Sequence, residues 1–328
     1  MILITGAAGY IGSITSYHFL KNNYKVIGID NISTGNARAL EVLNKFDNFK
    51  FYEGNFGNLE LIEQIVTNNK IDCVVHFAAN TSVFESTQNP LKYHDNNVSN
   101  MINLLKICEK YDINNFIFSS SAATYGEPKT NELITEDTPK NPINPYGLTK
   151  LIGEYILNDL SNAKKEFNFI ALRYFNVAGA SLIAPLGQFS KSSLLIKIAA
   201  ECAANKRDKM YLYGNDYNTP DGTCVRDYIH VDDLAIAHIE ALKYLKNQKT
   251  SQAFNVGYSK GTSVKEVIDI MKKISGNDFK VEMADRRTGD PSSLVASNKK
   301  ITSLTDWKYS NDNLELICKS AYEWELKI

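Results

Sequence analysis

The sequence has no excess of charge of either sign and no long apolar run. Among its 328 residues, 36 are basic and 37 are acidic, which leaves a net charge of -1. Nucleic-acid binding as a main function requires a basic surface, so this balance argues against a nucleic-acid partner. No stretch of about 20 apolar residues is present, so we expect no membrane span. The first residues also lack the basic leader of a secretory signal, and we expect a cytoplasmic protein.

Cysteine is scarce, and nothing in its spacing suggests a disulfide framework. The five cysteines are scattered along the chain at Cys73, Cys108, Cys202, Cys224 and Cys318. No pair has the spacing of metal ligands, and no other residue set suggests a metal. We therefore expect buried thiols in a reducing compartment and no metal site. Internal repeats, low-complexity tracts and Gly/Ser-rich linkers are missing as well.

Short apolar runs alternate with helical patterns through the first half of the chain. The expected strands are Met1–Thr5, Lys25–Asp30, Phe49–Glu53, Cys73–Phe77 and Phe116–Ser119. The helical patterns between them are Tyr10–Asn22, Ala37–Lys45, Leu59–Asn68 and Leu91–Tyr111. This alternation predicts βαβ units, and hence an α/β fold with a doubly wound, parallel, Rossmann-type sheet. Its ligand crevice should lie at the carboxyl ends of the strands.

The pattern loosens after about Phe175, where Gly and Pro become frequent and helices no longer each follow a strand. We expect a nucleotide-binding domain over residues 1–175. Residues 176–328 should mainly form a smaller α/β C-terminal lobe that covers the crevice. Because no flexible linker separates the two, the chain is expected to cross between the lobes more than once.

Three glycines, Gly6, Gly9 and Gly12, stand between the first expected strand and the first helix. This spacing lets the backbone approach a pyrophosphate, whose charge then faces the N-terminus of the helix. Asp30 ends the second strand, where a carboxylate binds both ribose hydroxyls and repels a 2′-phosphate. No arginine follows it in residues 31–35. The sequence therefore predicts a site for NAD rather than NADP.

A serine cluster ends the fifth expected strand, and a Tyr–Lys pair begins a later helix. Ser119–Ser121 should enter the crevice, while Tyr146 and Lys150 are four residues apart and share a helix face. A tyrosine with a pKa of about 10 is a poor base at neutral pH. A lysine ammonium at about 4 Å would lower that pKa. The pattern therefore predicts Tyr146 as a general acid/base.

Taken together, these motifs resemble the extended short-chain dehydrogenase/reductase family, and most of all its sugar-nucleotide enzymes. The resemblance covers nearly the whole chain. Further matching motifs are His76–Ala79, Asp95–Val98, Arg173–Asn176, Gly214–Tyr217, Val225–Val231 and Arg287–Asp290. It implies NAD as cofactor, a UDP-sugar as substrate and a homodimer as assembly.

Carried over by motif, the resemblance assigns residues to three roles. The catalytic residues are Ser121, Tyr146 and Lys150. The cofactor-binding residues are Gly6, Gly9, Tyr10, Ile11, Gly12, Asp30, Asn31, Ile32, Ser33, Thr34, Gly35, Asn55, Phe56, Phe77, Ala78, Ala79, Thr81, Asn96, Ser119, Tyr146, Lys150, Tyr174 and Phe175. The substrate-binding residues are Ser121, Tyr146, Asn176, Tyr211, Leu212, Tyr213, Arg226, Arg287, Asp290 and Leu294.

Arginine usage supports the expected diphosphate site independently. The chain has only six arginines beside thirty lysines, and three of the six (Arg226, Arg286, Arg287) fall in the late motifs. The guanidinium fork suits a diphosphate better than a point charge does.

The chain also departs from the family pattern at three positions. Asn55 replaces an aspartate at the adenine, and Thr81 replaces a lysine of the bacterial enzymes. Leu294 stands where some members place a tyrosine against the sugar.

The resemblance implies an isomerase that reversibly inverts C4 of a UDP-hexose through a transient 4-keto sugar. Tyr146 would take the 4-OH proton, Ser121 would bind that oxygen, and the C4 hydride would pass to NAD and return on the other face. UDP-glucose and UDP-galactose are the expected pair, and the smaller Leu294 would also admit N-acetylated sugars. Alternatives are a 4,6-dehydratase or decarboxylase, which usually has a carboxylate after the serine where this chain has Ala122-Ala123, and a non-catalytic NAD(P)-sensing protein.

Overall fold

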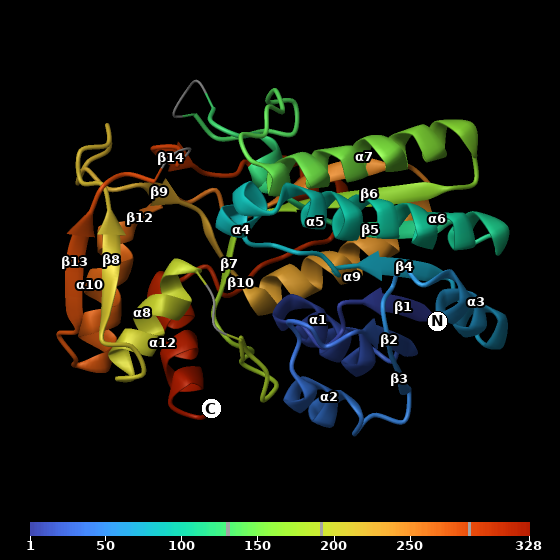
Figure 1. Cartoon of the computed structure of the whole chain (residues 1–328), viewed down its shortest axis with the longest axis horizontal. Coiled ribbons are helices and arrows are strands. Elements are labelled where there is room, and N and C mark those ends of the chain that lie inside the picture. The colour runs from blue at the N-terminus through green and yellow to red at the C-terminus, as the bar shows by residue number, and fades with distance from the viewer. Residues whose placement is uncertain (129–131, 191–192, 288–289) are drawn as a thin grey trace.

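The computed structural model has a larger lobe built on a seven-stranded sheet and a smaller lobe beside it (Figure 1). It describes residues 1–128, 132–190, 193–287 and 290–328. Every neighbouring pair in the large sheet is parallel, and the strand order is β11-β6-β5-β4-β1-β2-β3. The strands are β1 (Ile2–Thr5), β2 (Val26–Asp30), β3 (Phe49–Glu53), β4 (Cys73–His76), β5 (Asn115–Ser121), β6 (Asn168–Tyr174) and β11 (Gln252–Val256). The predicted doubly wound fold is therefore confirmed.

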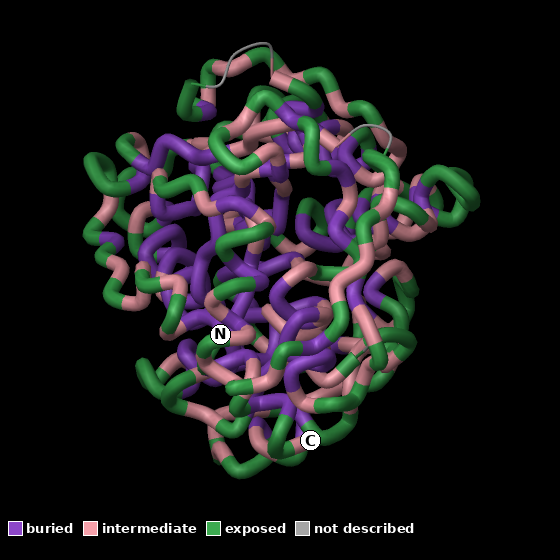
Figure 2. The backbone as a smooth tube through the Cα atoms, turned by 90° about the vertical axis from the view of Figure 1, so that its left-hand side faces the viewer, coloured by how far each residue is buried: buried purple, intermediate pink, exposed green. Residues whose placement is uncertain are grey.

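Helices cover both faces of this sheet, which explains why several of its strands are almost entirely apolar. Successive residues of β1 point to opposite faces, so Ile2 and Ile4 join one core cluster and Leu3 joins the other. The first face is covered by α1 (Tyr10–Lys21) and α9 (Val231–Gln248), with α2 (Ala37–Leu43) packed on α1. The second is covered by α3 (Leu59–Asn68), α6 (Asn100–Lys110) and α7 (Pro145–Ala163). Figure 2 shows the resulting buried interior beneath an exposed shell.

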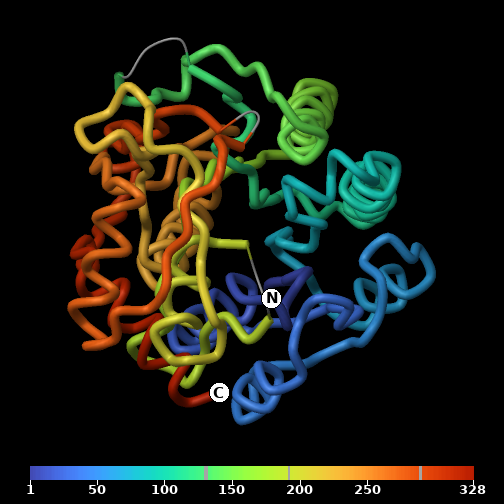
Figure 3. The backbone as a smooth tube through the Cα atoms, turned by 60° about the vertical axis from the view of Figure 1, so that its left-hand side comes forward, coloured from blue at the N-terminus to red at the C-terminus, as the bar shows by residue number. Residues whose placement is uncertain are grey.

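The smaller lobe is built from short strands and helices (Figure 3). Its strand pairs are β7 (Asn176–Ala178) with β10 (Tyr228–His230), and β8 (Lys209–Tyr213) with β13 (Lys280–Ala284). A third sheet places β9 (Val225–Arg226) between β12 (Thr262–Ser263) and β14 (Ser293–Leu294). The helices are α8 (Leu195–Ala203), α10 (Val264–Ser275) and α12 (Leu314–Glu325), whereas α11 (Lys299–Leu304) packs on β11 of the large sheet.

The structure differs from the expected elements in three places. A short helix, α4 (Val83–Gln88), precedes the helix expected over Leu91–Tyr111. That longer helix consists of α5 (Pro90–His94), a π-helical turn over Asp95–Ser99, and α6. In addition, α9 and β11 return from the second half of the chain to the large sheet. The division at residue 175 stays a prediction, and these two elements have to be counted with the first lobe.

In the described ranges, no helix is both long enough and apolar enough to cross a lipid bilayer.

The first glycine turn yields a stability prediction. A Cβ at Gly12 would lie 2.1 Å from the Gly6 carbonyl oxygen, whereas a Cβ at Gly9 would lie 3.2 Å from the same atom. We expect Gly12→Ala to lower the free energy of unfolding by about 2 kcal/mol, because overpacking forces α1 away from β1. Gly9→Ala should lower it less. Denaturant unfolding of both variants checks this, and equal losses would contradict it.

Candidate active site

The turn between β1 and α1 leaves helix N–H groups available to an anion. Gly9 is the N-cap of α1 and offers no side-chain cap, and the first N–H groups of a helix have no acceptor within it. Gly6 has a φ of +75°, and a Cβ there would meet the backbone nitrogen of Ala78 at 2.8 Å. The turn therefore lies directly against Phe77–Ala79, the segment that follows β4. This geometry suits a diphosphate at the helix N-terminus.

Asp30 lies beside this turn at the end of β2. One carboxylate oxygen accepts the Ala8 N–H at 2.9 Å and the other accepts the Ile32 N–H at 2.8 Å. Burial raises the pKa of this carboxyl, and the two backbone hydrogen bonds oppose the rise. Asp30 stays partly exposed, so its free lone pairs can accept ribose hydroxyls. The loop 31–35 folds back on the turn, where Gly35 contacts Ala8. The residues present thus fit the adenosine and diphosphate of NAD.

The predicted catalytic residues meet where α7 crosses the carboxyl end of β5. Asn144 caps α7 by accepting the Gly147 N–H, so Tyr146 lies in the first turn and Lys150 one turn later. The Lys150 ammonium donates to the Ser119 carbonyl at 2.6 Å and lies 5.9 Å from the centre of the Tyr146 ring. Tyr146 also forms a hydrogen bond with Ser121. The structure therefore brings Ser119, Ser121, Tyr146 and Lys150 together.

The electrostatics of this group differ from the sequence prediction. Burial raises the pKa of Tyr146 above its ordinary value, and the hydrogen bond with Ser121 only partly offsets this rise. Burial lowers the pKa of Lys150 to about 7, because its ammonium is almost fully desolvated. The lowering of the Tyr146 pKa that we predicted from Lys150 is therefore not produced by the protein groups alone.

Sequence reasoning missed Asn97, the neighbour of the predicted Asn96. Asn97 is buried in the π-helical turn, where its side-chain oxygen accepts the Asn80 N–H and the Asn96 amide. Its own amide donates to the Asn80 carbonyl and to the Thr149 hydroxyl on α7. Asn97 thereby ties the segment containing Ala79 and Thr81 to the helix that carries Lys150. A π-helical turn is frequent at functional sites, but only its Asn-Asn pair was visible in the sequence.

The smaller lobe gathers the predicted diphosphate and uridine residues. Arg226 pairs with Asp290 at 3.0 Å, and the Arg287 guanidinium lies 3.8 Å from the centre of the Tyr213 ring. Tyr211 is exposed on the same strand as Tyr213. Thr288 and Gly289 of this motif lie outside the described residues. A guanidinium stacked on an aromatic ring, together with the second guanidinium of Arg226, suits a nucleoside diphosphate.

Leu294 links this lobe to the catalytic end of β5. It pairs with Arg226 through β14 and β9. Its side chain packs on a cluster that includes Phe175 and Ala122, the residue after Ser121. Position 294 therefore borders both the predicted diphosphate anchor and the reactive group.

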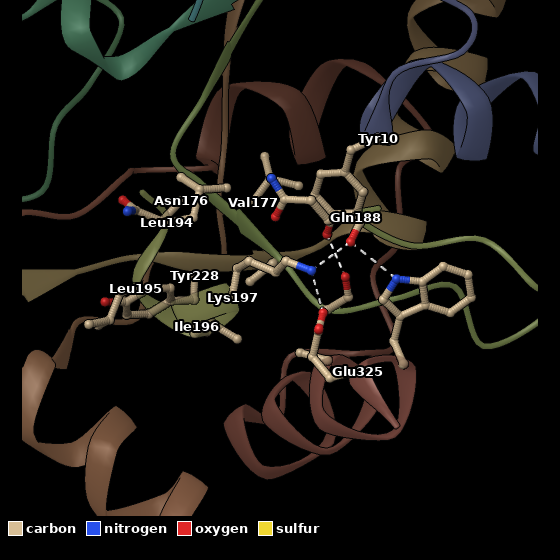
Figure 4. A pocket seen from close by; sticks show the side chains of 14 residues that line it. Tyr10, Asn176, Val177, Gln188, Leu194, Leu195, Ile196, Lys197, Tyr228 and Glu325 are labelled. Atoms are coloured by element: carbon tan, nitrogen blue, oxygen red, sulfur yellow. Dashed lines mark hydrogen bonds and ion pairs between the residues drawn. The ribbon is translucent and has the colours of Figure 1, made fainter. Parts of the chain in front are cut away.

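A pocket between the lobes is lined by residues from both of them (Figure 4). Tyr10 of α1 donates a hydrogen bond to the Gly179 carbonyl at 2.6 Å, and Asn176 of β7 lies on the same wall. Lys197 of α8 donates to the Gln188 carbonyl at 2.9 Å and pairs with Glu325 of α12. The pocket thus joins the first helix of one lobe to the last helix of the other.

Several predicted residues can reach the site only through their backbone. Phe56 is buried against His76, with ring centres 4.9 Å apart, and Leu212 points into the core. The Tyr174 side chain, by contrast, does reach the site: its hydroxyl is bonded to His238 and lies close enough to Ser119 and Tyr146 to interact with both. Asn55 accepts the Gly57 N–H, and Thr81 is exposed. Ile11 and Asn31–Thr34 follow the glycine turn and β2 as expected.

Within the described residues, no group of three or more His, Cys, Asp or Glu side chains could hold a metal.

Comparison with known proteins identifies the family to which the chain belongs. The model of the NAD dependent epimerase/dehydratase family matches residues 2–257. The UDP-glucose 4-epimerase of Halalkalibacterium halodurans is 42% identical over 324 residues, which cover 98% of this chain and 95% of that protein.

Solved structures agree with this match. The UDP-Glc/GlcNAc 4-epimerase of Campylobacter jejuni is 52% identical, with a TM-score of 0.88 over 100% of this chain and 99% of that one. UDP-glucose 4-epimerase from Bifidobacterium longum, solved with NAD+ and UDP, is 36% identical, with a TM-score of 0.94 over 99% and 98%. The chain therefore belongs to the NAD-dependent epimerase/dehydratase family, and the UDP-glucose 4-epimerases are among its full-length relatives.

Proposed function

We propose that this protein catalyses the reversible, NAD-dependent C4 epimerisation of a UDP-hexose through a transient 4-keto sugar. One observation carries the proposal. The Ser121–Tyr146–Lys150 group is at the carboxyl end of β5, in the sheet that also carries the dinucleotide-type turn, and Leu294 connects this end of the sheet to Arg226 of the smaller lobe. A sugar held by its diphosphate in the smaller lobe can thus present C4 to Tyr146.

Each residue of the group has a chemical task in this reaction. Tyr146 takes the proton of the 4-OH and returns it to the opposite epimer, while Ser121 hydrogen-bonds the same oxygen. The buried Lys150 ammonium favours the phenolate through its positive charge when it is protonated. The glycine turn and Asp30 would hold oxidised NAD, which would supply the hydride acceptor and a further positive charge. Arg226 and Arg287 hold the diphosphate, so that the keto sugar can turn without leaving the protein.

Replacing the phenol tests the proposal directly. We expect Tyr146→Phe to lower turnover of UDP-galactose by roughly 1,000-fold, because the proton of the 4-OH then has no acceptor. UDP affinity should stay unchanged, because the diphosphate contacts lie in the other lobe. Steady-state assays and calorimetry with UDP measure the two effects. Tyr155→Phe on the same helix is the matched control, because Tyr155 is exposed. Near-normal turnover of Tyr146→Phe would reject the assignment.

We also propose that the substrates include UDP-N-acetylglucosamine. Leu294 lacks the ring and hydroxyl of the tyrosine found at this position in some members, so more room remains beside the sugar. Its contact with the cluster around Ala122 and Phe175 supports a place near the reacting ring.

The size of residue 294 can be tested by restoring the ring. We expect Leu294→Tyr to lower kcat/KM for UDP-N-acetylglucosamine at least 10-fold, because one poorly accommodated group is worth about 1–3 kcal/mol. The value for UDP-glucose should change little. Leu294→Met, which conserves volume, is the control. Equal losses on both sugars would show that residue 294 does not select the substrate.

We further propose that the protein is a homodimer. Exposed apolar side chains gather on α4–α7, which pack on one another at one side of the sheet. These side chains are Val83, Phe84, Leu91, Ile102, Leu148 and Tyr155. Contiguous exposed apolar residues of this kind are typical of a contact surface.

The free, buried state of all five cysteines fits a protein of the reducing cytoplasm, which we propose as its location.

The dimer proposal predicts a mass change. We expect Leu91→Asp to shift the protein from dimer to monomer in light scattering, because a charge would be desolvated in the interface. Leu326→Asp is the control, since Leu326 is exposed on the opposite lobe. A monomeric wild type, or a Leu91→Asp variant that remains dimeric, would contradict the proposal.

A further inference from the structure

Three successive serines of β5 are each bound by one of three residues on a single face of α7. The Ser119 carbonyl accepts the Lys150 ammonium, and Ser121 hydrogen-bonds Tyr146. Between them, the Ser120 hydroxyl donates to a carboxylate oxygen of Glu154 at 2.5 Å. Tyr146, Lys150 and Glu154 are spaced four residues apart, so they lie one above another along the helix. The contacts of Ser119 and Ser121 involve the reactive residues, whereas the contact of Ser120 with Glu154 has no chemical task in the reaction.

Glu154 is held in turn by Arg173, the first residue of the Arg173–Asn176 motif. The Arg173 guanidinium donates to both carboxylate oxygens, at 2.9 Å and 2.7 Å, and both side chains are buried. A further guanidinium nitrogen donates to the Tyr125 hydroxyl at 2.7 Å. Tyr125 follows the turn that contains Ala122 and donates to Asn255 of β11 at 2.6 Å. The pair thus fastens α7 to β5, β6 and β11 at one point.

The position of Glu154 also matters for the charge of Lys150. A carboxylate one turn further along the same face is the natural partner of a lysine ammonium. Because Arg173 occupies both carboxylate oxygens, the ammonium is directed to Ser119 instead. A buried pair with bidentate geometry is stiff enough to hold this arrangement.

We propose that Glu154 and Arg173 are positioning residues for the reaction. Their ion pair sets the register of α7 against the three serines of β5 and keeps the Glu154 carboxylate away from Lys150. The expected change in turnover rests on the proposed function, whereas the effect of the ion pair on the register of α7 does not. Neither residue touches the substrate or the cofactor; both act through Tyr146 and Lys150.

The experiment compares Ser120→Ala and Glu154→Gln with the wild-type holoenzyme. Ser120→Ala removes one hydrogen bond and leaves the ion pair, so it should fold and lower kcat roughly 10-fold. Glu154→Gln should lower kcat roughly 100-fold, because a misplacement of about 1 Å has that effect on a reacting group. KM for UDP-galactose should stay within about twofold in both variants, because the diphosphate anchor is unchanged. A crystal structure of Glu154→Gln should show the Tyr146 hydroxyl out of hydrogen-bonding reach of Ser121.

Asp233→Asn is the control for a merely structural loss. Asp233 is buried and accepts hydrogen bonds from Tyr258 and Asn311, away from the site. It should lower the melting temperature without lowering kcat. The inference is overturned if kcat of Ser120→Ala stays at the wild-type value. It is also overturned if Asp233→Asn loses as much kcat for a given drop in melting temperature as Ser120→Ala and Glu154→Gln do. An inactive wild type would overturn the proposed function instead. The crystal structure of Glu154→Gln would then test this inference by itself. If the contact of Tyr146 with Ser121 is kept in that structure, the inference is overturned.

Discussion

The register of α7 against the carboxyl end of β5 is the constraint on which the reactive site depends. Close approach is possible because Gly153 faces the Phe118 ring, where a Cβ would come within 2.7 Å. Once α7 lies this close, its first three turns present Tyr146, Lys150 and Glu154 to the three serines. A shift of α7 by one residue would rotate all three away from β5, because successive residues are about 100° apart on a helix. The chemistry therefore depends on packing as much as on the reactive side chains.

This arrangement is costly for stability, which argues that it is kept for function. A buried ammonium loses its hydration, as the lowered pKa of Lys150 reflects. A buried ion pair such as Glu154–Arg173 is often no more stabilising than apolar residues of the same volume. Lys150 lies about one helical turn from Tyr146, and Glu154 lies about one turn further along the same helix. Perturbed, desolvated groups that cluster in this way are typical of reactive sites rather than of cores selected for stability alone.

The sheet and the reactive motifs could be predicted because local patterns encode them. The first five strands, the glycine turn of Gly6–Gly12 and the Tyr146–Lys150 spacing all follow from short windows of sequence. Asn97 and Asp227 could not be predicted, because their partners are distant in sequence: Asp227 accepts N–H groups of Tyr258 and Ala296. The return of β11 to the large sheet is non-local in the same way. For Phe56 and Leu212, the motif indicated the right segment, but the side chains point into the core, a direction that depends on packing rather than on the motif.

Asp227 also explains how the smaller lobe can change its substrate without losing its grip on the nucleotide. Its carboxylate joins the loop after β11 to Ala296, just after β14, and its own N–H donates to the Leu294 carbonyl. The backbone of β14 is thereby fixed beside Arg226, whatever side chain residue 294 carries. In the proposed function, the diphosphate anchor would depend on that backbone, whereas the wall of the sugar pocket would depend on the side chain. Because these two properties are separate, the sugar can vary at one residue while the reaction, set by α7 and β5 in the other lobe, stays the same.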